Sequence, residues 1–363
     1  MRILASASPG EVRVAAWDGT LVDAAIWRPG SPDGVGDIHR GRITRKLPAL
    51  AGAFVALADA DGFLPDSAGA ARATEGDFIA VAITRAAQGG KGPRLTRVER
   101  DPGAGPPALL QRGPDAVRRL AALHPAAEVV VDDPALAAIL RPALAGRMRI
   151  GPAFDDEMEG EFAALFTPSA DLPGGARLHV HTTPALTALD IDLGAATAER
   201  RAKAGAQAAA NRALIPALAR QIRLRNLAGA ILVDLGGMAA KKRSALAPDF
   251  AAALRDDPLA PRFLGFTALG LAEILRPRVH PPLAEYAAGP LAAGLAALRE
   301  AAARVAADPG RTLVLHATPA IVTALRADGT GLADFAARAG RPLALVETRL
   351  SPAPAWTIES PHG

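Results

Sequence analysis

The sequence predicts a multidomain protein that combines α+β and α/β regions. Its 363 residues are too many for one ordinary domain and fit two or three. The first hundred residues hold short alternating runs, separated by Gly and Pro at roughly the 8–12 residue spacing of a small barrel or sandwich. After the loop-like DPGAGPP at 101–107, helical and buried-strand patterns alternate, which is typical of α/β architecture.

Composition and charge narrow the classes of function. Half of the residues are hydrophobic and 21% are charged, which excludes a wholly disordered chain. The net charge of +4 permits a nucleic-acid partner without demanding one. The lack of Cys excludes disulfides, thiol catalysis and Cys-ligated zinc or iron–sulfur sites. The sequence has no signal-peptide core and no apolar run of about 18 residues, so we expect a soluble, cytoplasmic protein without a membrane span.

The elements of the first half follow from local patterns. Alternating strand-type runs occupy 11–27, 36–65, 76–86 and 94–100. They are followed by a predicted helix at 114–124, a buried strand at 127–133 and helices at 134–144 and 155–166. Pro134 suits a first helical turn, and the acidic start of 155–166 opposes the helix dipole favourably.

The second half is predicted in the same way. Its strands are expected at 176–183, 185–194, 228–237 and 261–270, and its helices at about 197–225, 241–257 and 271–283, where prolines stop the last helix. Beyond a weak boundary near 284–292, helices at 291–307, 319–327 and 332–340 alternate with strands at 311–318 and 342–349. This last part therefore predicts a small α/β unit.

Three aspartates form the strongest candidate for a catalytic site. Asp190 and Asp192 are two residues apart on a predicted strand, so they share one face of it. Asp234 ends another apolar strand just before a Gly-Gly turn. If those strands are neighbours, the carboxylates converge into a hard oxygen site suited to Mg²⁺ or Mn²⁺, which can activate water against phosphorus. The alternative is that each aspartate merely ends a strand or caps a turn.

Basic residues are dense around this acidic candidate. They are Arg200, Arg201, Lys203, Arg212, Arg220, Arg223, Arg225, Lys241, Lys242, Arg243, Arg276, Arg278 and His280. Such density favours a polyanionic substrate. Solvated helix faces would show the same pattern and stay open as the alternative.

The barrel-like region carries aromatic side chains among basic ones. Phe54 and Phe63 lie in alternating runs, and the basic residues around them are Arg42, Arg45, Lys46, Lys91 and Arg94. On a five-stranded barrel this combination forms a stacking platform for single-stranded nucleic acid. The alternative places both rings in the barrel core.

Two further motifs are weaker. His179 and His181 share a strand face and could bind zinc, but no third ligand is evident. The GGKG at 89–92 lacks the residues of a P-loop and predicts a hairpin turn.

Several segments, taken in order, resemble the ribonuclease E/G family of bacterial endoribonucleases, which cut single-stranded RNA. The segments are VGDIHRGRITRKLPALAGAFVAL, GGKGPRLT, LPGGARLHVHTTPALTALDID, ARQIRLRNLAGAILVD, LGLAEILRPRVHPPL and LVLHATPAIVTAL. The fourth is the most specific, and the last is similar to the C-terminal domain of the ribonuclease G branch. The resemblance runs collinearly over nearly the whole chain.

The resemblance implies a fold and its boundaries. An RNase H-like subdomain (1–33 with 104–170) would be interrupted by an S1-like, OB-type RNA-binding barrel (34–101). A DNase I-like catalytic subdomain (171–285) and a small C-terminal α/β domain (286–363) would follow.

The resemblance also implies site residues. Asp190 and Asp234 fall on the family's two metal-binding positions, with Asp192 beside them as a third catalytic candidate. Phe54, Phe63 and Lys91 fall on positions of the S1 barrel that help to grip RNA. By their charge, further RNA contacts are expected from Arg42, Arg45, Arg94, Arg223, Arg225, Arg276 and Arg278.

The chain departs from the family pattern near the expected site. Asp192 stands where the family has Asn, and Pro184 and Ala213 each stand where the family has Glu. Gly236 and Gly237 stand where the family usually has a further acidic residue. The segment between Thr96 and about Leu109 is drastically short and has nothing like the Arg-Thr pair that senses a 5′-monophosphate. AEYAA at 284–288 stands where paired Cys link family subunits through zinc, and there is no Arg-rich scaffold tail.

These features predict an endoribonuclease that requires Mg²⁺ or Mn²⁺ and hydrolyses single-stranded RNA to 5′-phosphate and 3′-hydroxyl products, independently of the RNA 5′ end. We expect neither zinc nor a zinc-linked dimer, and assembly through other surfaces stays open. One alternative is an RNA-binding homologue that has lost catalysis. Another is a metal-dependent hydrolase of a different phosphate substrate.

Overall fold

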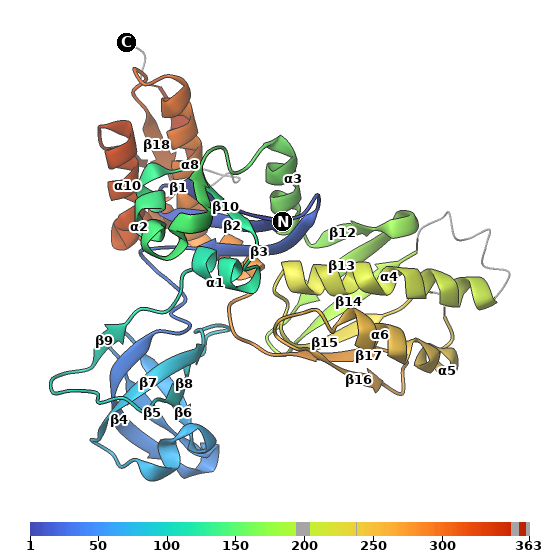
Figure 1. Ribbon diagram of the computed structural model, residues 1–363. Helices are drawn as coiled ribbons and strands as arrows, with labels where there is room; N and C mark the ends of the chain where they lie inside the picture. Colours follow the sequence, from blue (N-terminus) through green and yellow to red (C-terminus); the bar gives the residue numbers. More distant parts are fainter. Residues whose placement is uncertain (194–203, 237, 350–355, 361–363) are drawn as a thin grey trace. The chain divides into compact units, whose positions relative to one another are not determined.

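The computed structural model describes residues 1–193, 204–236, 238–349 and 356–360 (Figure 1). Within them the expected mixture of helices and sheets is confirmed, and one of the sheets closes into a barrel. The chain divides into two compact units, residues 1–32, 115–162 and 283–363 in one and residues 33–114 and 163–282 in the other. Among the helices of these described residues, none combines the length and the hydropathy that crossing a bilayer requires.

The first unit opens with a sheet in the order β11–β10–β1–β2–β3. Its strands are β1 (Arg2–Ser8), β2 (Glu11–Trp17), β3 (Leu21–Trp27), β10 (Glu128–Val131) and β11 (Met148–Ile150). The helices beside it are α1 (Ala116–Leu123), α2 (Pro134–Leu144) and α3 (Asp156–Ala164). Asp115 and Asp133 cap α1 and α2 by accepting backbone N–H bonds, so the predicted helix starts are confirmed.

The rest of the first unit is a small layer of helices on a sheet. Strand β18 (Val314–Ala317) lies between β19 (Ala344–Glu347) and β20 (Trp356–Glu359). The helices are α7 (Leu283–Ala287), α8 (Gly289–Ala307), α9 (Pro319–Asp328) and α10 (Thr330–Ala339). Gly10, in the β1–β2 turn, meets Gly331 of α10 so closely that a Cβ on Gly10 would lie 2.8 Å from the Cα of Gly331.

The second unit contains the barrel. Its strands are β4 (Ile38–Leu47), β5 (Gly52–Ala56), β6 (Asp61–Pro65), β7 (Phe78–Arg85) and β8 (Arg94–Arg97), and β9 (Ala108–Gln111) adds to β4. They pair in the order β5–β6–β8–β7–β4, and pairing of β4 with β5 closes the ring, which is the OB-type order. The predicted hairpin at 89–92 is confirmed, because Gln88 pairs with Lys91 and both Gly89 and Gly90 have positive φ.

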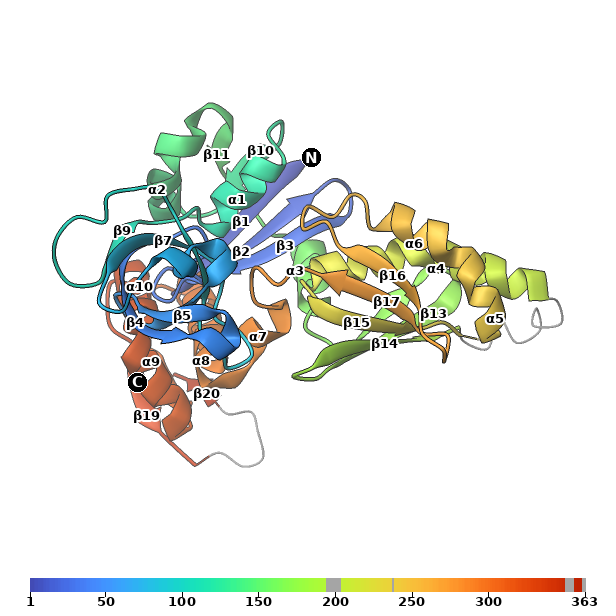
Figure 2. The ribbon, with the colours of Figure 1, turned by 90° about the horizontal axis from the view of Figure 1, so that it is seen from below.

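The second unit also contains a six-stranded sheet in the order β12–β13–β14–β15–β17–β16. Its strands are β12 (Ser169–Leu172), β13 (Ala176–Thr182), β14 (Leu186–Asp192), β15 (Gly229–Asp234), β16 (Arg262–Phe266) and β17 (Ala272–Arg276). Its helices are α4 (Ala204–Leu224), α5 (Ala240–Arg243) and α6 (Ala247–Ala253). Figure 2 shows β15 between β14 and β17, with α4 and α6 on one side of the strands.

The helix predicted at 271–283 is wrong. Residues Ala272–Arg276 form β17, which pairs antiparallel with both β15 and β16. The apolar spacing of this segment is compatible with either structure, and three prolines at 277, 281 and 282 prevent a helix from continuing. Two neighbouring strands supply the backbone partners that decide the outcome, and no local pattern reports them.

Candidate functional site

Asp190 and Asp234 lie directly opposite each other on the parallel strands β14 and β15. Both side chains are exposed, whereas the alternate positions Leu189, Ile191 and Val233 are buried. The sequence expectation that the two strands are neighbours is therefore correct. Neighbouring strands are about 4.8 Å apart, so two carboxylates at paired positions stand side by side on one face of the sheet.

The opposite face of the same sheet forms the hydrophobic core. Leu178, Ile191, Ile231 and Ile274 pack there against α4 and α6, together with Phe250. Because side chains alternate along a strand, burial of one set of residues forces the aspartates outward. The core of this sheet thus fixes the direction in which the acidic pair points.

The row of polar residues extends to a third strand. His179 of β13 is the pairing partner of Asp190, so His179, Asp190 and Asp234 follow one another across β13, β14 and β15. Asp192 lies two residues further along, opposite Arg177 and beyond the last residue of β15. The three predicted catalytic aspartates share one face, but Asp192 has a basic neighbour where Asp190 has an imidazole.

Arg243 holds Asp234 from the side. Its Nη1 lies 2.9 Å from Oδ1 of Asp234 and donates to the carbonyl oxygen of Gly270 as well. Its Nε donates to the carbonyl oxygen of Met238 at 2.9 Å. The guanidinium is mostly buried, so it fixes the carboxylate while leaving more than half of it exposed. The sequence placed Arg243 only among basic neighbours, and its pairing with Asp234 was missed.

Asn211 fixes the turn that follows Asp234. It lies on α4, is fully buried, and donates from Nδ2 to the carbonyl oxygen of Gly236 at 3.0 Å. The neighbouring Ala213 is exposed and has no polar group to offer this turn. Gly237, one of the predicted departures, lies outside the described residues.

Whether a metal ion fits this site depends on the ligand groups that the side chains offer. Among the residues with a described position, no three His, Asp or Glu side chains are arranged to enclose a metal ion. Mg²⁺ usually keeps several waters and is bound through one or two carboxylates plus substrate phosphate, so Asp190 and Asp234 match what that ion needs from a protein. Zinc prefers nitrogen and sulfur ligands, and His179 with His181 has no such third partner in the described part of the chain.

The barrel carries a second candidate surface. Arg45, Phe54, Phe63 and Arg94 are successive pairing partners across β4, β5, β6 and β8. The rings of Phe54 and Phe63 meet edge to face with centroids 6.1 Å apart. Phe54 is 41% exposed and Phe63 is half-buried, so the alternative that both rings fill the barrel core is wrong.

Other exposed groups lie on the same barrel. The guanidinium of Arg42 lies 5.8 Å from the ring centroid of Phe78, which is itself 40% exposed. Lys91 is exposed at the end of its hairpin. Phe78 was missed at the sequence level, although it begins an alternating run and could have been found from its position beside Asp77.

Two predicted RNA-binding arginines have a different role. All five N–H groups of Arg225 are used, on the side chain of Gln221 and the carbonyl oxygens of Ala164, Leu165, Thr167 and Ser169. Arg276 is 3% exposed, and its Nε lies 2.7 Å from Oδ2 of Asp257. Arg225 and Arg276 therefore stabilise the fold, and the geometry does not support their assignment to an RNA surface.

The remaining basic residues are dispersed. Arg223 donates to the carbonyl oxygen of Asp256, and the exposed Arg278 packs on Gly229 so tightly that no Cβ would fit there. Arg212 forms an ion pair with Asp249 at 2.9 Å. The predicted basic residues Arg200, Arg201 and Lys203 lie outside the described residues.

Comparison with known proteins agrees with the sequence motifs. Residues 147–279 match the sequence model of the Ribonuclease E/G family. The chain is 36% identical over 117 residues to Ribonuclease E of Nostoc sp., which covers 31% of this chain and 16% of that protein. It is 33% identical over 136 residues to Ribonuclease G of Escherichia coli K12, and the match covers 37% of this chain and 27% of that protein. It is 29% identical over 191 residues to Ribonuclease E of Synechocystis sp., and the match covers 47% of this chain and 28% of that protein.

The expected resemblance to this family is therefore confirmed over a central segment. The chain spans less than a third of the length of each of these relatives. The matched segment contains Asp190, Asp234, Asn211 and Arg243.

Proposed function

We propose that the chain, which matches the Ribonuclease E/G family over residues 147–279, is an endoribonuclease that hydrolyses single-stranded RNA at the Asp190–Asp234 pair. The observation that carries the proposal is the pairing of these two exposed aspartates inside the matched segment. In this proposal the β12–β17 sheet and its helices are the DNase I-like catalytic part, the barrel is the S1-like part, and residues 1–32 with 115–162 are the RNase H-like part.

Asp190 and Asp234 would hold one Mg²⁺ or Mn²⁺ ion. When bound, such an ion supplies Lewis-acid stabilisation of the phosphate and lowers the pKa of a water molecule. Arg243 keeps the Asp234 carboxylate in one orientation, and Asn211 keeps the turn behind it in place. Arg243 and Asn211 thus set the position of the Asp234 carboxylate before any substrate arrives.

The barrel would bind the RNA strand. Exposed aromatic faces stack on bases without regard to sequence, and the arginines at both ends of the Arg45–Phe54–Phe63–Arg94 row would contact phosphates. Because the chain lacks any counterpart of the family's 5′-sensing pair, cleavage is proposed to be independent of the RNA 5′ end.

A second candidate function has one observation in its favour. The ion pair of Arg243 with Asp234 occupies one of the four carboxylate oxygens that a metal would use. If Arg243 out-competes the metal, the chain would be an RNA-binding protein without turnover.

One experiment separates the two. Single-stranded RNA of the same sequence, with a 5′-hydroxyl or a 5′-monophosphate, is incubated with the purified chain in Mg²⁺, beside Asp234→Asn. Equal cleavage of both RNAs that is lost in the variant supports the nuclease. Saturable binding with no cleavage in Mg²⁺ or Mn²⁺ overturns it in favour of RNA binding alone.

A further inference from the structure

The first unit contains a cavity of about 710 Å³ that the proposed function does not use. It lies between the end of β1, the start of β2 and the helices α8 and α10. Its apolar wall includes Ala296, Ala303, Val305 and Phe335, and its polar wall includes Arg13 and Arg299. Sites for small molecules typically have volumes of about 300–1,000 Å³, with mainly apolar walls and a few fixed polar groups.

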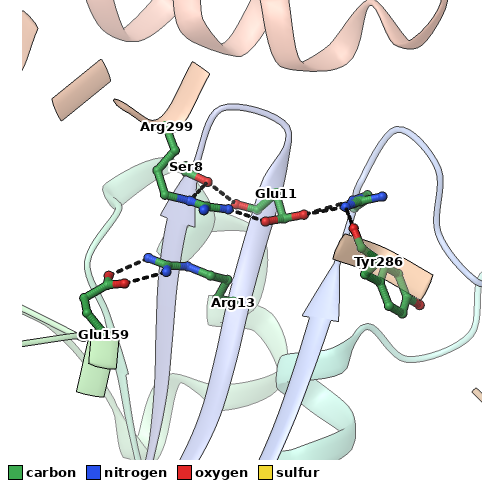
Figure 3. A network of polar contacts seen from close by, with 7 residues as sticks. Ser8, Glu11, Arg13, Glu159, Tyr286 and Arg299 are labelled. Atoms are coloured by element: carbon green, nitrogen blue, oxygen red, sulfur yellow. Dashed lines mark hydrogen bonds and ion pairs between the residues drawn. The ribbon is translucent and has the colours of Figure 1, made fainter. Parts of the chain in front are cut away.

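The charged end of the cavity is a network of ion pairs in which Arg299 and Glu159 are partly exposed (Figure 3). Arg13 forms a bidentate pair with Glu159, both N···O distances being 2.6 Å. Arg299 bonds to Glu11 and, from Nε, to the hydroxyl of Ser8 at 3.3 Å. Arg28 bonds to the second oxygen of Glu11 at 2.9 Å and lies over the ring of Tyr286. Arg13 and Arg299 thus reach the network from β2 and from α8.

This network carries more positive than negative charge. Three guanidinium groups, those of Arg13, Arg28 and Arg299, face two carboxylates, those of Glu11 and Glu159, so one positive charge is left over. The pKa of Arg299 is lowered, first by burial and then by the charge of Arg13. An excess cation in a partly buried network is a favourable place for an anion, because the anion removes the repulsion among the guanidinium groups.

One donor in the network lacks a partner. Arg13 is 92% buried, and its Nε has no hydrogen-bond acceptor in the described part of the chain. Arg13 is held in place by Glu159 and by the ring of Phe154, whose centroid lies 5.0 Å from its Cζ. Because this Nε has essentially no accessible surface, a ligand in the cavity cannot reach it, and the group that can meet an anion there is the Arg299 side chain, which is 31% exposed.

The other charged groups of the wall pair with neighbours of opposite charge, and together they hold one negative charge in excess. Arg338 pairs with Asp133 and Asp334, each at 2.8 Å, and Glu300 pairs with Arg304. Neither set contacts the guanidinium of Arg299, whose charged neighbours are Arg13, Arg28, Glu11 and Glu159. The positive excess therefore belongs to the Arg13–Arg299 end, and the Arg338 pairs hold the negative excess.

We propose that this cavity binds a small organic anion, with a single phosphate or carboxylate group at the Arg13–Arg299 end and an apolar body against α8 and Phe335. The ligand would supply the missing negative charge beside Arg299, which lines the cavity. The site belongs to the first unit and is independent of the aspartate pair in the second.

The test uses the full chain and three probes of one shape. Phenyl phosphate, benzoate and the uncharged benzamide are titrated by calorimetry, and the thermal unfolding midpoint is followed with each. At least one anion is expected to bind saturably and to raise the midpoint, whereas benzamide at the same concentration does neither. Tighter binding of phenyl phosphate identifies a phosphate ester, and tighter binding of benzoate identifies a carboxylate.

Variants locate the binding. Arg299→Met keeps the length of the side chain, removes its charge, and should weaken the preferred anion at least tenfold. Ala303→Phe leaves every charge in place and should block the cavity from an exposed position of α8. Arg326→Met removes an exposed arginine of α9 that pairs with Glu347 away from the cavity and should change nothing.

Three results would overturn the proposal. The first is that neither anion binds. The second is that Arg326→Met and Arg299→Met weaken anion binding equally. The third is that single-stranded RNA displaces the anion. The last result would make the cavity part of the RNA surface. Cleavage of RNA is not a readout here, so failure of this proposal is distinguishable from failure of the proposed nuclease.

Discussion

Asp190 and Asp234 are pairing partners on two parallel strands, with 43 residues of chain between them, and they share the open face of a sheet whose other face is covered by α4 and α6. Two like charges at adjacent exposed positions repel each other. Arg243 compensates part of that repulsion through Asp234, and the proposed divalent cation would relieve the rest.

Removal of either carboxylate should abolish turnover. Asp190→Asn and Asp234→Asn keep the size of the side chain but remove an anionic metal ligand, and each should lower the cleavage rate by about 10²–10³ or more, as for other groups that stabilise a transition state electrostatically. Initial rates on a labelled RNA in Mg²⁺ measure the effect. Asp249→Asn, on α6 at the opposite face of the sheet, is the control that should cleave at the wild-type rate.

Asn211 should matter through the turn that it holds. Asn211→Asp preserves shape but replaces the Nδ2 donor by an oxygen that faces the carbonyl of Gly236, and the free energy of unfolding should fall by about 1–3 kcal/mol. Denaturant unfolding measures it. The adjacent Arg212→Met loses only an exposed ion pair and should cost less than about 1 kcal/mol. An equal loss for both variants would contradict the role given to Asn211.

The aromatic row on the barrel should bind RNA. Phe54→Ala should weaken the binding of single-stranded RNA by about 1–3 kcal/mol, the usual value for one stacked base. It should affect stability less than removal of a buried ring, because Phe54 is 41% exposed. Fluorescence anisotropy with a labelled oligonucleotide gives the affinity. Leu50→Ala removes another exposed apolar side chain of the barrel and should leave the affinity unchanged, unless the effect of Phe54 is a general loss of apolar surface.

Substitution of Arg276 should lower stability, whereas substitution of Arg94 should weaken RNA binding. Arg276→Met leaves Asp257 buried without its partner and should destabilise the chain by about 3–5 kcal/mol. Arg94→Met, at an exposed position on β8, should leave stability unchanged, weaken RNA binding and reduce its dependence on salt concentration. Thermal unfolding and anisotropy at several salt concentrations test both. Intact stability of Arg276→Met would show that its ion pair is dispensable.

His39 should make stability depend on pH. Burial lowers its pKa from the usual 6.5, with Asp37 opposing and Arg112 adding to the effect, and neither ring nitrogen has a hydrogen-bond partner in the described structure. Below about pH 6.5 the unfolded chain binds a proton that the folded chain resists, so stability is complete above this pH and falls as the pH is lowered through it. His39→Gln should flatten the fall in unfolding midpoint between pH 7.5 and 5.5. His181→Gln, at an exposed position, should not.

Much of this architecture could be predicted from local sequence. Strict alternation gave the barrel strands and β14 with β15, because a strand with one buried face repeats every two residues. Pro134 indicated the beginning of α2 because its fixed backbone angle suits a first helical turn. The direction of Asp190 followed from the same alternation.

The errors share a physical cause, which is dependence on partners far away in sequence. The choice of strand over helix for β17 depends on β15 and β16. Arg225 reads as a surface cation until the carbonyl groups of 164–169 are placed around it. The missed pair of Arg243 with Asp234 is an exception, because these residues are only nine positions apart and no local pattern reports that their side chains meet.

The contact of Gly10 with Gly331 has a consequence for the order in which the protein is made. The barrel and its neighbouring sheet are built from residues that leave the ribosome before α8 and α10 exist. The hairpin β1–β2 can pack on α1 and α2 earlier, but the part of it that meets α8 and α10 lacks its cover until those helices emerge, and Ser8 and Glu11 lack Arg299 until then. A chaperone that binds nascent chains should therefore find its longest-lived target in the first strands, and a premature stop codon before α10 should leave this N-terminal face exposed to degradation.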